Sequence, residues 1–175
     1  MKRIYLMRHS KAGQTDKNML SDHERTLTKK GEDQASLVAP YFLKHYKDNP
    51  PEVIFSSTAI RAKQTASLFK KFFSHNPEIE IKTFQDLYVT SPEQILDIIN
   101  RCSDDYKSIL IISHCPGLQE FAVSFARSGD KTKFREMRAN FPPGSFATFN
   151  SEVKNWYEIT NNSAILLDFV NGKKL

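Results

Sequence analysis

The chain has 175 residues, of which 39% are hydrophobic and 26% charged, and its formal net charge is +5. No apolar run reaches the roughly 20 residues that a membrane helix requires. The opening MKRIYLMRHS lacks the apolar segment of a secretory signal. These features are typical of one soluble globular domain. We therefore expect a single cytoplasmic domain over residues 1–175, with no membrane partner.

The distribution of lysine and cysteine excludes further classes of protein. The lysines are spread along the chain rather than gathered in one basic segment, so we expect no nucleic-acid partner. Cys102 and Cys115 form no CxxC pair, and neither is followed six positions later by arginine. The phosphate loop of the cysteine-dependent phosphatases has that spacing, so this class of phosphatase is excluded.

The first half of the chain predicts alternating strands and helices. An apolar strand over residues 4–7 precedes a polar, exposed loop over residues 11–27. Thr28 is suited to cap the next helix, which Pro40 should kink or shorten. This helix has an apolar face at helical spacing: Ala35, Val38, Phe42 and Tyr46. A strand over residues 53–55 then leads into a helix with its own apolar face: Ala62, Ala66, Phe69 and Phe73.

The second half continues this alternation and then changes. A strand over residues 79–81 and a helix over residues 92–101 precede the aliphatic run 108–112, which predicts a strand buried on both faces of a parallel sheet. A helix should begin near Pro116. Three antiparallel edge strands are expected at the end of the chain: 145–150, 156–160 and 164–170. The expected fold is a three-layer α/β/α sandwich with a mostly parallel central sheet and antiparallel edge strands.

Arginine and histidine residues follow three of the predicted strands. Arg8 and His9 come directly after the first strand. Arg61 lies in the first helical turn after the second strand, and His114 follows the aliphatic strand. Because ligands of open α/β sheets bind at the carboxyl ends of the strands, we expect these side chains to meet at one edge. Guanidinium groups bind phosphoryl oxygens, and neutral imidazole is a good nucleophile towards phosphorus.

The histidines do not form a metal-binding motif. The five histidines have no i, i+3 or i, i+4 spacing, and no HxH or HExxH occurs. We therefore expect neither a metal nor another cofactor.

Three segments in order along the chain are LMRHS at 6–10, SSTAIRAKQT at 56–65 and ISHCPGL at 112–118. They resemble the signature segments of the histidine phosphatase superfamily, which has the phosphoglycerate mutase-like fold. The run ERTLTKKGEDQA at 24–35 resembles the R-x-L-T-x-x-G segment of the small SixA-type phosphohistidine phosphatases. The short length and the run FPPGSFATF at 141–149 are also similar to that type.

This resemblance implies a role for each matching residue. His9 would be the nucleophile that forms a phosphohistidine intermediate, and His114 would contact the phosphoryl group from the opposite side. Arg8 and Arg61 would bind that group.

Three further residues are candidates on weaker grounds. Ser10 stands where the family commonly has glycine, and Arg25 belongs to the SixA-like segment. Both are candidate contacts to the substrate or its phosphate. Larger relatives carry a carboxylate as proton donor, and Asp86 in QDLY is the nearest candidate for that role here.

Together these features predict a metal-independent phosphatase that acts through a phosphohistidine intermediate. Its expected partner is a phosphorylated substrate, with a phosphohistidine-bearing protein as the first class to test. The short chain leaves no room for the large insertions that build a deep specificity cap. The alternatives within the same chemistry are a small-molecule phosphomonoester phosphatase and a mutase. An alternative from another class is a non-catalytic phosphate-binding or basic adaptor protein.

Overall fold

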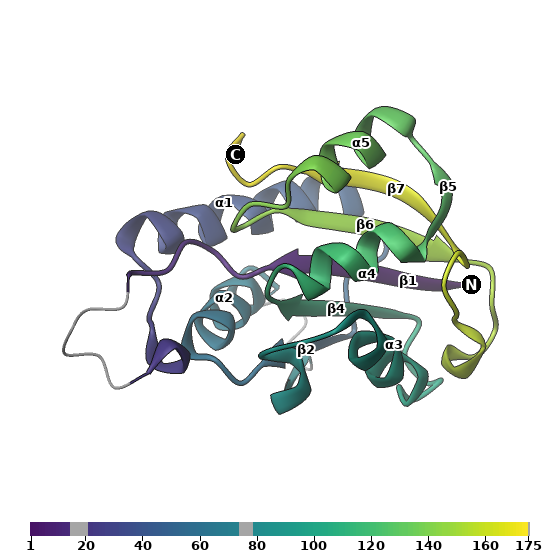
Figure 1. Cartoon of the computed structure of the whole chain (residues 1–175), viewed down its shortest axis with the longest axis horizontal. Coiled ribbons are helices and arrows are strands. Elements are labelled where there is room, and N and C mark those ends of the chain that lie inside the picture. The colour runs from purple at the N-terminus through teal and green to yellow at the C-terminus, as the bar shows by residue number, and fades with distance from the viewer. Residues whose placement is uncertain (15–20, 74–78, 175) are drawn as a thin grey trace.

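The computed structural model describes residues 1–14, 21–73 and 79–174, whose strands form one seven-stranded sheet (Figure 1). The strands, in spatial order, are β3 (Glu80–Phe84), β2 (Val53–Ser57), β4 (Ser108–Ser113), β1 (Lys2–Arg8), β6 (Phe146–Ser151), β7 (Ala164–Val170) and β5 (Ala126–Gly129). The first four run parallel to one another. Strand β6 is antiparallel to both of its neighbours, β1 and β7.

Helices cover both faces of the sheet, as Figure 1 shows. They are α1 (Lys29–Tyr46), α2 (Ile60–Lys71), α3 (Pro92–Asn100), α4 (Gly117–Phe125) and α5 (Lys131–Ala139). Alternate residues of a strand point to opposite faces. Thus Tyr5 and Met7 of β1 pack with α1 and α2, whereas Ile4 and Leu6 pack with α3 and α4. The expected three-layer α/β/α architecture is confirmed.

Local signals place the helix starts close to where the sequence predicts them. The side chain of Thr28 caps α1 by accepting a hydrogen bond from the backbone N–H of Gly31. Helix α1 continues beyond Pro40 to Tyr46, so Pro40 does not shorten it. Pro40 is exposed, and the buried side chain of Phe42 keeps the following turn on the sheet. In the described part of the chain, no helix has the length and apolarity needed to cross a membrane.

The expected strand over residues 156–160 is wrong. Residues Trp156–Glu158 form a 3-10 turn, which a capping box between Asn155 and Glu158 stabilises. The indole of Trp156 is fully buried, and its Nε1–H donates to the carbonyl oxygen of Tyr106 at 3.0 Å. The apolar residues of this segment therefore anchor a turn to the core and do not alternate across a strand.

Strand β5 has no hydrophobic pattern and helix α5 has a short one, Phe134 and Met137, and the sequence analysis predicted neither element. All four residues of β5 are exposed or half-buried, and α5 buries only Met137. Strand β5 pairs parallel with β7 and forms one edge of the sheet. The prediction of antiparallel pairing at the edge therefore holds for β6 and β7 and is wrong for the outermost strand.

The loop expected over residues 11–27 returns to the sheet edge where β1 ends. Residues 15–20 of this loop lie outside the described residues. The others include a 3-10 turn over Asp22–Glu24 and a β-bridge between Ala12 and Leu27. This bridge holds the base of the loop next to the residues that follow β1.

Candidate active site

The two histidines meet because their strands are adjacent and parallel. In the β1–β4 pair, Arg8 is opposite Ser113, so His9 and His114 leave the sheet at the same level. Their ring centroids lie 4.9 Å apart, and both side chains are buried. The predicted convergence at the carboxyl ends of the strands is therefore present in the structure.

Hydrogen bonds determine which nitrogen of His9 carries the proton. Its Nδ1 lies 2.7 Å from the carbonyl oxygen of Ser10, which can only accept, so Nδ1 is the donor. The Nε–H of Arg61 points to Nε2 of His9 at 3.3 Å. Burial, together with the charges of Arg61 and Arg8, lowers the pKa of His9 to about 3. The ring is therefore neutral near pH 7, with the lone pair on Nε2.

His114 has the opposite tautomer. Its Nδ1 accepts from Nη2 of Arg61 at 3.3 Å, because a guanidinium group can only donate. Its Nε2–H then donates to Oγ of Ser57 at 2.8 Å. Burial lowers the pKa of His114 to about 3, and the nearby His9 and Arg61 add to this effect. Ser57 is thus a positioning residue that the sequence analysis did not single out.

Arg61 occupies the centre of the cluster. It lies in the first turn of α2, and its side chain is only 6% exposed. Its charge is balanced by Asp22, whose Oδ2 accepts from Nη2 at 2.9 Å and whose carbonyl oxygen accepts from Nη1 at 2.6 Å. One turn along α2, Thr65 donates to the Arg61 carbonyl oxygen at 2.7 Å and accepts the backbone N–H of Ser10 at 3.1 Å. Helix α2 therefore fixes both the arginine and the loop after β1.

Two buried polar atoms near His9 have no hydrogen-bond partner among the described residues. They are Nε of Arg8 and Oγ of Ser10. Nη1 of Arg8 donates to the carbonyl oxygen of Phe141 at 2.9 Å, and the N–H of Gly144 donates to the Arg8 and His9 carbonyl oxygens at 3.2 Å. Buried polar groups are nearly always paired in folded proteins. These two atoms therefore have unused hydrogen-bonding capacity.

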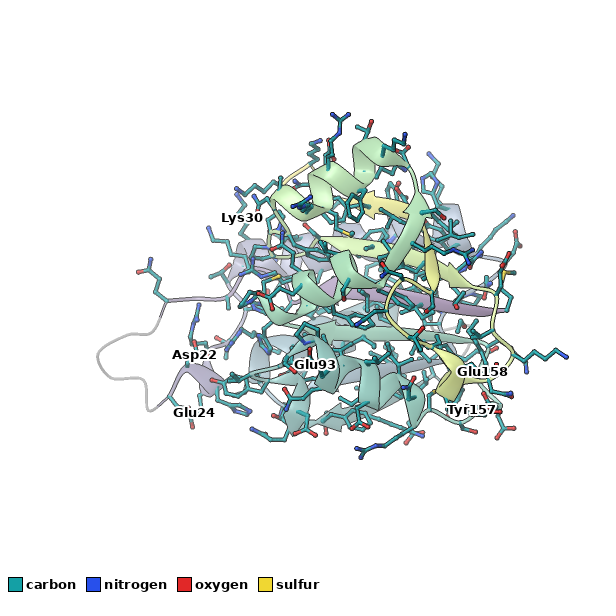
Figure 2. The ribbon with its side chains drawn as sticks, turned by 45° about the vertical axis from the view of Figure 1, so that its right-hand side comes forward. Asp22, Glu24, Lys30, Glu93, Tyr157 and Glu158 are labelled. Carbon is teal, nitrogen blue, oxygen red and sulfur yellow. The ribbon has the colours of Figure 1, made fainter. Side chains whose placement is uncertain are left out.

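Asp22 connects the cluster to its surroundings and was missed by the sequence analysis. Its Oδ1 accepts from Nη1 of Arg25 at 2.6 Å, and its Oδ2 accepts from the hydroxyl of Tyr88 at 2.9 Å. Arg25 contacts this carboxylate, and its Nε donates to the carbonyl oxygen of Gly13 at 2.7 Å. Asp22 precedes Arg25 by three residues, and this spacing is the signal in the sequence that could have indicated the ion pair. Figure 2 shows Asp22 at one end of the molecule, opposite Tyr157.

A hollow of about 290 Å³ opens beside the cluster and is lined in part by Asp22, Arg61, Tyr88 and His114. Asp86 is exposed and lines a different hollow, with Lys82 among its neighbours. The structure therefore does not bring Asp86 to the histidines. Among the residues described, no group of three histidine, cysteine or acidic side chains has the geometry of a metal site.

Comparison with known proteins finds a family match over the first part of the chain. The sequence model of the histidine phosphatase superfamily (branch 1) matches residues 4–88, which contain Arg8, His9 and Arg61. Over these residues the chain is similar to the histidine phosphatase superfamily. An uncharacterized relative from Mycobacterium leprae (strain TN) is 27% identical over 169 residues, which cover 93% of this chain and 98% of that protein.

Solved structures share the fold of this chain. A candidate phosphohistidine phosphatase SixA from Nakamurella multipartitia aligns with a TM-score of 0.81 and 22% identity, covering 97% of this chain and 95% of that one. The protein histidine phosphatase SixA complexed with tungstate aligns with a TM-score of 0.75 and 17% identity, covering 98% of both chains. The compact fold predicted from the sequence is therefore that of the small SixA structures.

Proposed function

We propose that this protein is a histidine phosphatase, which hydrolyses phosphorylated substrates in two steps through a phosphoryl group carried on Nε2 of His9. The single observation that carries the proposal is the environment of the His9 ring. Ser10 holds the proton on Nδ1, so the lone pair of Nε2 faces the guanidinium group of Arg61. A buried, neutral imidazole with a fixed tautomer is an activated nucleophile at neutral pH.

The surrounding groups suit the charge that moves during the transfer. Arg61 and Arg8 would hold the phosphoryl oxygens by charge-assisted hydrogen bonds, with the unpaired Oγ of Ser10 as a further donor. His114 would contact the same group from beside His9. In the second step a water oxygen attacks phosphorus, and the electron pair of the broken N–P bond returns to Nε2 of His9. The protons of the water leave with the released phosphate.

We propose a protein-borne phosphohistidine as the substrate class. The similarity of fold to SixA structures supports this choice, as does a site that opens directly at the surface. The chemistry of the site also supports it. Asp86 lies away from the histidines, and its contacts with Arg25, Tyr88 and Arg61 hold the pKa of Asp22 well below its usual range. A phosphorylated imidazole can leave without a protonated carboxyl group, whereas an alkyl ester needs one. The cytoplasmic location expected from the sequence remains part of this proposal.

The proposal is tested by trapping the intermediate. Purified protein in chelator should hydrolyse phosphoimidazole and p-nitrophenyl phosphate. After an acid-free quench, mass spectrometry should find an acid-labile, base-stable phosphoryl group on His9. His9→Ala should abolish both turnover and labelling, while the variant His45→Ala, changed on the exposed surface of α1, should retain them. Full activity of His9→Ala, or no turnover by the unaltered protein, would overturn the proposal.

A further inference from the structure

The carboxylate of Asp22 has capacity for one more hydrogen bond. A carboxylate offers about four acceptor positions, and Arg25, Arg61 and Tyr88 use three of them. The Asp22 side chain is 46% exposed and faces the hollow beside His114. The fourth position is therefore accessible to a substrate that enters this hollow.

An ionised carboxylate is an unusual group to find in the lining of a phosphate-binding hollow. It repels a phosphoryl dianion, and it has no proton to give to a leaving group. Its contacts with Arg25 lower its pKa, so it stays ionised at neutral pH. Asp22 balances the charge of Arg61, and its remaining acceptor position suits a cationic part of a substrate.

Phosphohistidine supplies such a cation. One ring nitrogen carries the phosphoryl group, and the other takes up a proton with a reference imidazole pKa near 6.5. The protonated ring then departs as neutral imidazole instead of an imidazolide anion. The leaving groups of phosphate esters carry no comparable N–H cation.

We propose that Asp22 binds the protonated second ring nitrogen of a phosphohistidine substrate and so selects phosphoramidates over phosphate esters. This inference rests on the proposed function and identifies Asp22 as a specificity-determining residue for it. The ring of Tyr88, edge-on to His114 with centroids 5.6 Å apart, forms a neighbouring wall of the same hollow.

The transfer step balances without a proton from the protein. The Nε2 lone pair of His9 forms the new N–P bond, and the substrate N–P bond breaks. Its electron pair stays on the departing ring nitrogen, and the proton on the other nitrogen remains hydrogen-bonded to Asp22. The His9 intermediate has the same arrangement, because its Nδ1–H is held by the Ser10 carbonyl oxygen. Hydrolysis of the intermediate therefore also releases a neutral imidazole.

The test compares two substrates in two variants. Asp22→Asn should lose about tenfold more kcat/KM with phosphoimidazole than with p-nitrophenyl phosphate, because one charge-assisted hydrogen bond is lost. Glu24→Gln removes the other acid of the same turn and should leave both rates unchanged, since Glu24 contacts Ser21 and not the cluster. Equal losses on both substrates in Asp22→Asn would overturn the inference, because Asp22 would then only hold Arg61.

A second measurement needs only the unaltered protein. Asp22 favours the protonated ring in the bound state, so the alkaline limb of kcat for phosphoimidazole should lie about one pH unit above the limb of kcat/KM. Four other charged or titratable groups surround Asp22: Arg25, Arg61, Tyr88 and His114. The pKa of Tyr88 is raised, and the pKa of His114 is lowered to about 3. Coincident limbs would overturn the inference. Absence of turnover with both substrates would instead overturn the proposed function.

Discussion

Acidification should destabilise this protein through its two site histidines. The unfolded chain has a reference histidine pKa near 6.5, whereas burial lowers the pKa of His9 and of His114 to about 3 in the folded state. Between these values the unfolded state binds more protons, so the free energy of unfolding rises with pH. Stability is therefore complete above about pH 6.5 and is lost as the pH falls towards 3.

The expected loss can be worked out for one ring. Each pH unit inside this window costs about 1.4 kcal/mol per histidine. Lowering the pH from 7 to 5 crosses about 1.5 units of the window, so each ring should cost about 2 kcal/mol. For a urea m-value of about 2 kcal/mol/M, this equals a shift of about 1 M in the unfolding midpoint.

The assay is urea unfolding at pH 7 and pH 5, followed by fluorescence of Trp156. This residue is the single tryptophan and is fully buried, so unfolding exposes it. His9→Gln and His114→Gln should each lose about 2 kcal/mol less than the unaltered protein on acidification. His45→Gln, changed at an exposed position on α1, should behave as the unaltered protein does. Parallel losses in all four proteins would refute the reasoning.

Two further substitutions test the geometry of the site. Arg61→Lys keeps the charge but loses the planar fork that faces both histidines, and it should lower kcat/KM for phosphoimidazole about 100-fold. An unchanged rate would show that charge alone suffices. In Gly31→Ala, the new Cβ would lie 1.9 Å from the carbonyl oxygen of Lys11, two residues after His9, so urea unfolding should show a loss of about 2 kcal/mol together with lower turnover. Gly13→Ala, whose Cβ would have a normal 4.0 Å contact, should change neither.

The regular elements follow largely from local sequence. The aliphatic run 108–112 is a strand buried on both faces, and Thr28 caps α1. These predictions succeed because burial periodicity and capping act over a few residues. The same reasoning fails at Trp156, where a distant hydrogen bond to Tyr106 decides the conformation. It also fails at β5, which has almost no buried side chain and depends on pairing with β7.

The sequence by itself determined the placement of His9, His114 and Arg61 at the ends of strands and the start of a helix. Their meeting follows from parallel strand order, and the matched segments indicate their chemistry. Only the tertiary structure decided which nitrogen of each histidine carries the proton, because Ser10 and Ser57 reach the rings through folding. It also brought to the site a carboxylate, Asp22, that the sequence analysis had not singled out. Asp86 is exposed and lines a different hollow. A loop from the first quarter of the chain instead carries Asp22 to Arg61, since a buried guanidinium group requires a countercharge.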